Sequence, residues 1–282
     1  MRARWFSITV AVVMAVVFIA PTIVVVGSSF SDSSFISFPP EGFSLRWYDD
    51  VFGDPQWMRA FGNSVAVGLL AAALAIVVGT LLAMGAARSR ILPSAAVTGL
   101  AVIPIVVPSV VLGVGFYIVA VNLGFTGSVV GLALAHAALG APYVFVGVLA
   151  ALTSVDRSTE EAARVSGATQ LGAFLRVTVP AIAPAALVGG LLAFITSWDE
   201  VIVAGFMTSP SFRTLPVLIF AQVRTGADPS TSAVATVVTV FSLLLMLVVG
   251  GVSALLARRR RLAATKARAD DTATSAPEKG SR

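Results

Sequence analysis

Two long stretches without a charged side chain restrict this sequence more than any other feature. No Asp, Glu, Lys or Arg occurs between Arg59 and Arg88, and none occurs between Arg90 and Asp156. A helix needs roughly 20 apolar residues to cross the hydrocarbon core of a bilayer. Charged residues make up only 12% of the chain, whereas soluble domains carry about 25%. The sequence therefore predicts an all-α polytopic membrane protein.

Six apolar segments, each long enough to cross a bilayer, define the predicted organisation. The predicted transmembrane helices are residues 5–27, 61–87, 91–121, 127–153, 179–206 and 232–257. The first segment is longer than the apolar region of a cleaved signal peptide, so we interpret it as an uncleaved anchor. The spans form one domain of residues 1–257, which includes a polar loop at 154–178. The basic tail at 258–282 has a composition that predicts disorder.

Residues within the second and third spans predict how these helices pack and bend. Small residues recur every four positions along one face of the second span, where another helix can approach closely. They are Ala71, Ala75, Gly79, Ala83 and Ala87. Pro104 and Pro108 interrupt the third span. Because proline lacks a backbone donor, we expect a kink or a break near the middle of the membrane.

Two polar segments, residues 28–59 and 207–229, are predicted as loops on the same side of the membrane. The first contains Trp47, Tyr48 and Trp57. Tryptophan and tyrosine concentrate where the bilayer meets water. We therefore interpret the first loop as a segment that lies on the membrane surface.

The distribution of basic residues predicts the orientation of the chain. Of the 19 Lys and Arg residues, only Arg46, Arg59, Arg213 and Arg224 fall in those two loops. The others flank the opposite ends of the spans. Because basic residues accumulate on the cytoplasmic side, both termini and the loop at 154–178 are predicted to be cytoplasmic.

Composition excludes several classes of function. The chain has no cysteine and a single histidine, His136, so thiolate and histidine-rich metal centres are ruled out and we expect neither a metal nor a cofactor. His136 has no Gly-x-Ser-x-Gly partner, so we predict no catalytic residues and no enzyme. The net charge of +5 arises from residues that flank spans, so it does not indicate nucleic-acid binding.

The polar interval that ends at Pro180 has a regular internal spacing. A Glu-Ala-Ala triplet occupies 161–163, Gly167 follows after three residues, and Val-Thr-Val-Pro follows after nine more. We predict a short surface helix, a bend at Gly167, a second short helix, and a proline where the next span begins. A tight bend that any Cβ would crowd would explain the glycine.

This spacing resembles the cytoplasmic signature of the permeases of binding-protein-dependent ABC importers, with valines in place of isoleucine and leucine. Three further stretches are similar to the second permease component of spermidine/putrescine-type importers. They are FPPEGFSLRWY after the first span, LAHAALGAPYVF at 134–145, and SWDEVIVAGFM at 197–207. The resemblance extends from the first span to Ala257.

The resemblance implies a type I ABC importer permease-like fold of six transmembrane helices in the inner membrane. It implies pairing with a second permease subunit as a heterodimer, two cytoplasmic ATPases beneath, and an extracytoplasmic solute-binding protein that delivers a small solute, a polyamine or a related amine. The residues implied in ATPase coupling are Glu160, Glu161, Ala162, Ala163, Gly167 and Pro180. The only lysines, Lys266 and Lys279, follow no Gly-rich phosphate loop, so energy must come from a partner.

Asp199 and Glu200 form the only acidic pair inside a predicted span. A carboxylate at membrane depth costs roughly 2.5–3.5 kcal/mol unless it faces a cavity or a partner. The pair can line a path for a cationic solute, together with the neighbouring Trp198. Alternatively, it can have a structural role, in which it holds a kinked helix through hydrogen bonds or pairs with the other permease. His136 has no ionisable neighbour within its own span, so we interpret it as a packing residue.

A self-sufficient secondary transporter or channel is the alternative function. Six kinked helices and a buried acidic pair would also suit such a protein. Two observations argue against it. No internal repeat is visible between the halves of the chain, and only the pair Asp199–Glu200 offers an ion site.

Overall fold

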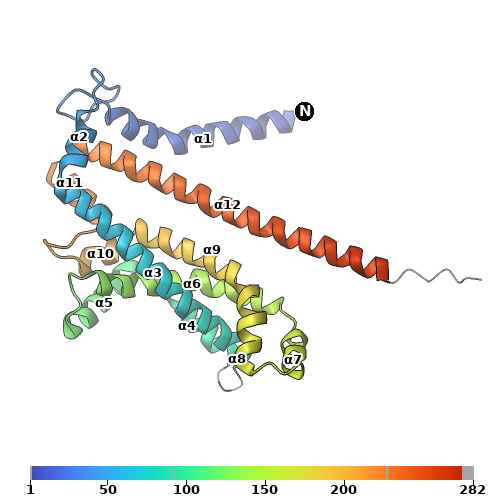
Figure 1. Ribbon diagram of the computed structural model, residues 1–282. Coiled ribbons are helices and arrows are strands. Elements are labelled where there is room, and N and C mark those ends of the chain that lie inside the picture. Colours follow the sequence, from blue (N-terminus) through green and yellow to red (C-terminus); the bar gives the residue numbers. More distant parts are fainter. Residues whose placement is uncertain (1, 90, 92, 227, 275–282) are drawn as a thin grey trace, which may run out of the picture.

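The computed structural model describes residues 2–89, 91, 93–226 and 228–274 and is shown in Figure 1. Most of these residues lie in helices, and an isolated bridge joins Ser209 to Phe212. The elements are α1 (Arg2–Ser28), α2 (Arg46–Gly53), α3 (Pro55–Arg88), α4 (Ser94–Val106), α5 (Ser109–Leu123), α6 (Val129–Thr153), α7 (Arg157–Val165), α8 (Gln170–Ala173), the π-helix η1 (Phe174–Thr178), α9 (Val179–Trp198), α10 (Ile202–Met207), α11 (Leu215–Gly226) and α12 (Pro229–Thr274).

Among the described residues, five helical segments are long and apolar enough to cross a membrane. They are Arg4–Ser28, Pro55–Arg88, Val129–Thr153, Gln170–Trp198 and Pro229–Leu255. A sixth span is obtained if α4 and α5 are counted together, although their axes are bent by 104°. The predicted all-α membrane fold is therefore confirmed.

The break in the third predicted span lies at Val107 and Pro108, and Pro104 is accommodated inside α4. Val107 has an extended backbone with ψ 131°. Proline disfavours a helical conformation in the residue before it, because its Cδ meets that residue's backbone. The prediction of a proline break is thus correct for Pro108, whereas Pro104 does not break the helix.

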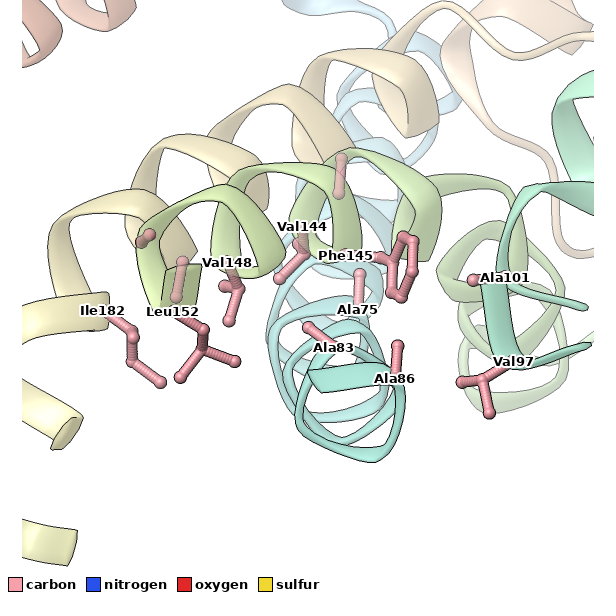
Figure 2. Close-up of a cluster of buried hydrophobic side chains, with 13 residues drawn as sticks. Ala75, Ala83, Ala86, Val97, Ala101, Val144, Phe145, Val148, Leu152 and Ile182 are labelled. Carbon is pink, nitrogen blue, oxygen red and sulfur yellow. The ribbon is translucent and has the colours of Figure 1, made fainter. Parts of the chain in front are cut away.

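Helices α3, α6 and α9 pack against one another and form the centre of the protein. Figure 2 shows a cluster of buried apolar side chains from these three helices. Helix α4 contributes Val97 and Ala101 to the same cluster. Small residues allow the close approach. A Cβ added to Gly79 would lie 2.7 Å from the carbonyl oxygen of Ala141, and one added to Gly189 would lie 2.6 Å from the Cα of Val144. The predicted small-residue face of the second span is the face that contacts α6.

Helices α1 and α12 extend away from this centre (Figure 1). They contact each other near their outer ends, where the hydroxyl of Ser28 donates to that of Ser232 over 3.2 Å. The apolar window of α1 has no residue buried within the chain. Helix α12 continues to Thr274, so the segment predicted to be a disordered tail is helical as far as that residue. Residues 275–282 lie outside the described part.

Both predicted loops contain helices. Trp57, assigned to the first loop, is buried in α3, which begins at Pro55 rather than at residue 61. The second loop contains α11, which packs on α3 and α12. The start of α11 is fixed by α3, because the backbone N–H of Leu215 donates to the hydroxyl of Ser64 over 2.8 Å. The prediction of a continuous loop at 207–229 is therefore wrong, because an apolar helix, α11, lies between polar residues in this segment.

Candidate functional site

The Glu-Ala-Ala triplet lies on α7, a short surface helix with defined ends. At its start, the side chain of Asp156 accepts a hydrogen bond from the backbone N–H of Ser158 over 2.9 Å. This bond favours the carboxylate and lowers the pKa of Asp156. Because the pKa is depressed, the cap stabilises α7 at neutral pH and is lost as the pH falls through this lowered pKa.

Helix α7 ends in a paired turn centred on Gly167. The N–H of Gly167 donates to the carbonyl of Arg164 over 3.0 Å, and that of Ala168 donates to Ala163 over 3.1 Å. These two bonds form a Schellman motif, which needs a left-handed residue at the position of the glycine. Gly167 has φ +93°. The bend is therefore confirmed, but a Cβ added to Gly167 would meet no atom within 4 Å, so crowding is not its cause within the described part of the chain.

The outer surface of α7 exposes both charged and apolar side chains. Glu161, Arg164 and Val165 line a surface depression of about 540 Å³ with Ala168 and Gln170. Val165 is 90% exposed. The predicted coupling segment thus presents charged and apolar side chains on an exposed face of α7.

Glu160 is turned the other way, toward the membrane part of the chain. Its two carboxylate oxygens accept from both terminal nitrogens of Arg88, at 3.1 and 3.0 Å. Arg88 is the last residue of α3, and it also donates to the hydroxyl of Thr178 over 3.2 Å. Glu160 and Glu161 are therefore neighbours in sequence with different surroundings.

Pro180 lies within a continuous helical segment, Gln170–Trp198. The predicted second short helix is α8, and it runs through the π-turn η1 directly into α9. The N–H of Val179 donates to the carbonyl of Phe174, five residues earlier. A proline removes one donor from the regular helix ladder, and this π-turn lies immediately before Pro180.

The acidic pair lies at a helix break. Helix α9 ends at Trp198, so the predicted continuous span 179–206 is divided. The carboxylate of Glu200 accepts from the backbone N–H groups of Ile202, Val203 and Ala204, at 2.9, 2.9 and 2.8 Å. It therefore caps α10, where the helix dipole favours a negative charge. Asp199 is exposed.

His136 on α6 contacts this break from inside the protein. Its Nδ1 lies 2.7 Å from the hydroxyl of Ser197, and its Nε2 lies 3.4 Å from a carboxylate oxygen of Glu200. The imidazole is 1% exposed. His136 is buried, as a packing residue would be, but it has an ionisable neighbour, Glu200, which comes from another part of the chain.

Trp198, predicted to lie beside the solute path, is buried in an aromatic cluster. It is 1% exposed, and its ring contacts those of Phe61, Phe194 and Phe241. Its indole N–H donates to the hydroxyl of Ser242 over 3.2 Å. The structure thus separates three consecutive residues: Trp198 joins α9 to α12, Glu200 caps α10, and Asp199 remains exposed.

Comparison with known proteins identifies the family. Residues 75–262 match the family described as binding-protein-dependent transport system inner membrane component. The chain belongs to this family. It is therefore a transport permease of the inner membrane, and its predicted membership of the ABC importer permeases is confirmed.

Two curated relatives of this permease are named for polyamine transport. The spermidine/putrescine transport system permease protein PotC of Haemophilus influenzae is 34% identical over 227 residues, which cover 79% of this chain and 86% of the relative. The putrescine transport system permease protein PotI of Escherichia coli is 34% identical over 226 residues, which cover 78% and 80%.

Solved structures show that the permease shares its fold with ABC importers. A bacterial ABC transporter involved in the import of the acidic polysaccharide alginate aligns with a TM-score of 0.67 and 18% identity, over 90% of this chain and 96% of that one. The alginate transporter in complex with its pentasaccharide-bound periplasmic protein aligns with a TM-score of 0.65 and 16% identity, over 88% and 92%. The comparisons favour a permease subunit over a self-sufficient secondary transporter or channel.

Sequence reasoning missed the contacts that hold both candidate regions in place. The sequence presents Arg88 only as a topological charge, and His136 only as a packing residue. Their partners, Glu160 and Glu200, lie on other elements. The available signal is in each case a lone polar side chain at the end of, or inside, an apolar helix, where charge or hydrogen-bonding capacity needs a partner.

Proposed function

We propose that this permease passes a small polyamine or related amine across the inner membrane and that a separate cytoplasmic ATPase drives it through α7. The observation that carries the coupling role is the surface of α7. A capped helix with a fixed Schellman end exposes Glu161, Arg164 and Val165 beside Gly167. Fixed ends and an exposed face that carries charged and apolar side chains suit a helix that enters a cleft on another protein. We call this face of α7 the docking surface.

The geometry agrees with the orientation predicted from charge. The end of α3 that carries Arg88 contacts α7, and its other end lies beside α2 and α11 (Figure 1). Arg46 lies on α2, and Arg59 lies on the first turns of α3. The end with α2 and α11 carries only four of the 19 Lys and Arg residues of the sequence. Because basic residues accumulate in the cytoplasm, we assign the opposite end, with α7 and both termini, to the cytoplasmic side.

The proposed assembly contains a second permease subunit, two ATPases and an extracytoplasmic binding protein. The apolar side chains of α1, which are not covered within this chain, leave room for other subunits or lipid. A solved relative of the same fold is described in complex with a periplasmic protein. The chain's own lysines lie only in the tail, which supports a separate source of ATP hydrolysis.

Two features support a cationic amine as the solute. Both curated relatives described above are named for spermidine or putrescine. Asp199 exposes a carboxylate at the break between α9 and α10. A negative charge there would compensate an ammonium group as it loses water. We therefore assign solute contact to Asp199, whereas Glu200 and Trp198 position the break.

The coupling role is tested by two substitutions at one position. In the reconstituted complex, Gly167→Val should abolish the solute-stimulated ATPase activity, because a β-branched residue is strained at φ +93°. Gly167→Asn should retain most of it, because asparagine tolerates the left-handed region. Both variants should insert and assemble normally. Full stimulation of the valine variant would contradict the assignment of α7.

The solute class is tested by direct competition. Uptake of labelled putrescine by the reconstituted importer should be inhibited by excess spermidine and unaffected by a neutral sugar of similar size. Inhibition by the sugar, or the absence of putrescine uptake in a complex with an active ATPase, would exclude the polyamine assignment while leaving the coupling test intact.

A further inference from the structure

A single arginine connects α7 to the membrane helices. The guanidinium of Arg88 lies at 3.1 and 3.0 Å from the two carboxylate oxygens of Glu160, a bidentate arrangement. One of its nitrogens also donates to Thr178 over 3.2 Å. The contact therefore joins the end of α3, the first turn of α7 and the π-turn η1. We call these three residues the Arg88 clamp.

The clamp lies where its charges are most effective. The side chains of Arg88 and Glu160 are 26% and 16% exposed, so water screens their attraction less than at an open surface. Arg88 is the last residue of α3, and Glu160 lies in the first turn of α7. A cation at a helix C-terminus and an anion at an N-terminus are each favoured by the helix dipole, and the planar fork of arginine fixes their relative orientation.

Close packing does not replace the clamp. Helix α7 packs on α8 and η1. A cavity of about 470 Å³ borders Arg88 and Glu160 and is lined by residues of α3, α7, α8 and η1. Side chains that border this volume lack packing contacts on that side, so α7 is in steric contact with α8 and η1 but is joined to α3 chiefly through Arg88 and Glu160. The hydrogen bonds of Arg88 can transmit a displacement of α7 to α3, because they join the end of α3 to Glu160 on α7.

Thr178 extends the connection to α9. It is fully buried, and it is the last residue of η1. A π-turn is a local interruption of the helix ladder and is frequently found at functional sites. A displacement of α7 that reaches Thr178 through Arg88 therefore acts at η1, where α8 joins α9. The same displacement pulls on α3 at its last residue, Arg88.

We propose that Arg88 is a positioning residue of the transport reaction, which carries the movement of α7 to α3 and α9 through Glu160 and Thr178. This proposal rests on the proposed docking of the ATPase on α7. It also separates two neighbouring acids: Glu161 faces the docking surface, and Glu160 serves the connection inside the chain. The predicted contribution of Glu160 to coupling is thereby given an intramolecular basis.

The experiment is a charge exchange in the reconstituted complex with its binding protein and labelled putrescine. The quantity measured is solute transported per ATP hydrolysed, normalised to assembled complex. Arg88→Glu and Glu160→Arg should each lower this ratio at least fivefold, because like charges then face each other. The double variant Arg88→Glu/Glu160→Arg should recover to within about threefold of the parent, since the pair is restored but opposes both helix dipoles.

Two controls separate the clamp from general effects. Arg59→Glu reverses an exposed arginine on the same helix and should leave the ratio unchanged. Thr178→Val keeps the shape but removes the acceptor of Arg88, and it should lower the ratio less than either charge reversal. A merely structural role would instead reduce the amount of assembled complex at an unchanged ratio.

The outcomes distinguish the clamp from the docking proposal. If Gly167→Val loses coupling while the charge reversals do not, or while the double variant is no better than the single ones, the clamp is refuted and the docking surface stands. If Gly167→Val retains coupling, the docking proposal itself fails. Recovery in the double variant, with loss in both single ones, supports the clamp.

Discussion

The close packing of α3 against α6 makes a quantitative prediction for Gly79. A methyl group added there would lie 2.7 Å from the carbonyl oxygen of Ala141, 2.7 Å from the Cβ of Val144 and 3.0 Å from the backbone nitrogen of Phe145. Two of these atoms are backbone, so a rotamer change cannot relieve the contact. Gly79→Ala must push α3 away from α6.

The magnitude follows from two opposing effects. Overpacking a well-packed interior typically costs about 1–3 kcal/mol. Replacing glycine by alanine inside a helix returns about 0.8–1.0 kcal/mol through propensity. A Cβ added to Gly62, on the same helix, would have no neighbour within 4 Å, so Gly62→Ala gains the second effect without the first. We expect the two variants to differ by about 1–3 kcal/mol, with Gly79→Ala the less stable.

The assay is heat-induced unfolding of the purified complex in detergent, with the midpoint of the loss of folded protein as the readout. Gly79→Ala should lower the midpoint by several degrees, and Gly62→Ala should leave it unchanged or raise it. Because both substitutions add the same atoms to one helix, their difference isolates packing. Equal midpoints would refute the geometry of the α3–α6 contact.

Three further predictions concern the acidic break and the topology. Asp199→Asn should reduce putrescine uptake severalfold at an unchanged thermal midpoint, whereas Glu200→Gln should lower the midpoint because it weakens the cap of α10; the opposite pattern would exchange their roles. His136→Ala leaves buried polar partners unsatisfied and should lower the stability by about 1–3 kcal/mol. In a double-mutant cycle followed by thermal unfolding, Ser197→Ala should cost little further stability once His136 is replaced. Additive losses of stability would exclude a direct His136–Ser197 bond. A reporter fused to the carboxyl terminus should be cytoplasmic, and one inserted at 31–38 should face outward.

The helical class of the protein was predictable because it depends on local properties. Long apolar runs define the spans, and the residue preceding Pro108 is constrained by its immediate neighbour. The bend at Gly167 was also predicted from a local signal. Its cause was not, because a positive φ and a crowded Cβ favour glycine equally in a sequence and differ only in the structure.

The contacts that assemble the candidate sites were not predictable because they join distant residues. Arg88 and Glu160 are separated by 72 positions, and His136 and Ser197 by 61. Helix α11 was missed for a related reason. Its start depends on a hydroxyl of α3, Ser64, 151 positions away. No window of neighbouring residues contains such a cap.

The attachment of α1 has a consequence for how the chain responds to its surroundings. In water, a long uncovered apolar helix would collapse onto the nearest apolar surface. Acyl chains are as apolar as leucine, so a bilayer supplies no such force between helices. Contacts with α12, which include the bond between Ser28 and Ser232, therefore hold the outer end of α1. The rest of the helix is positioned by the lipid or the subunits around it. The angle of α1 becomes a property of the membrane and of neighbouring subunits as much as of this sequence.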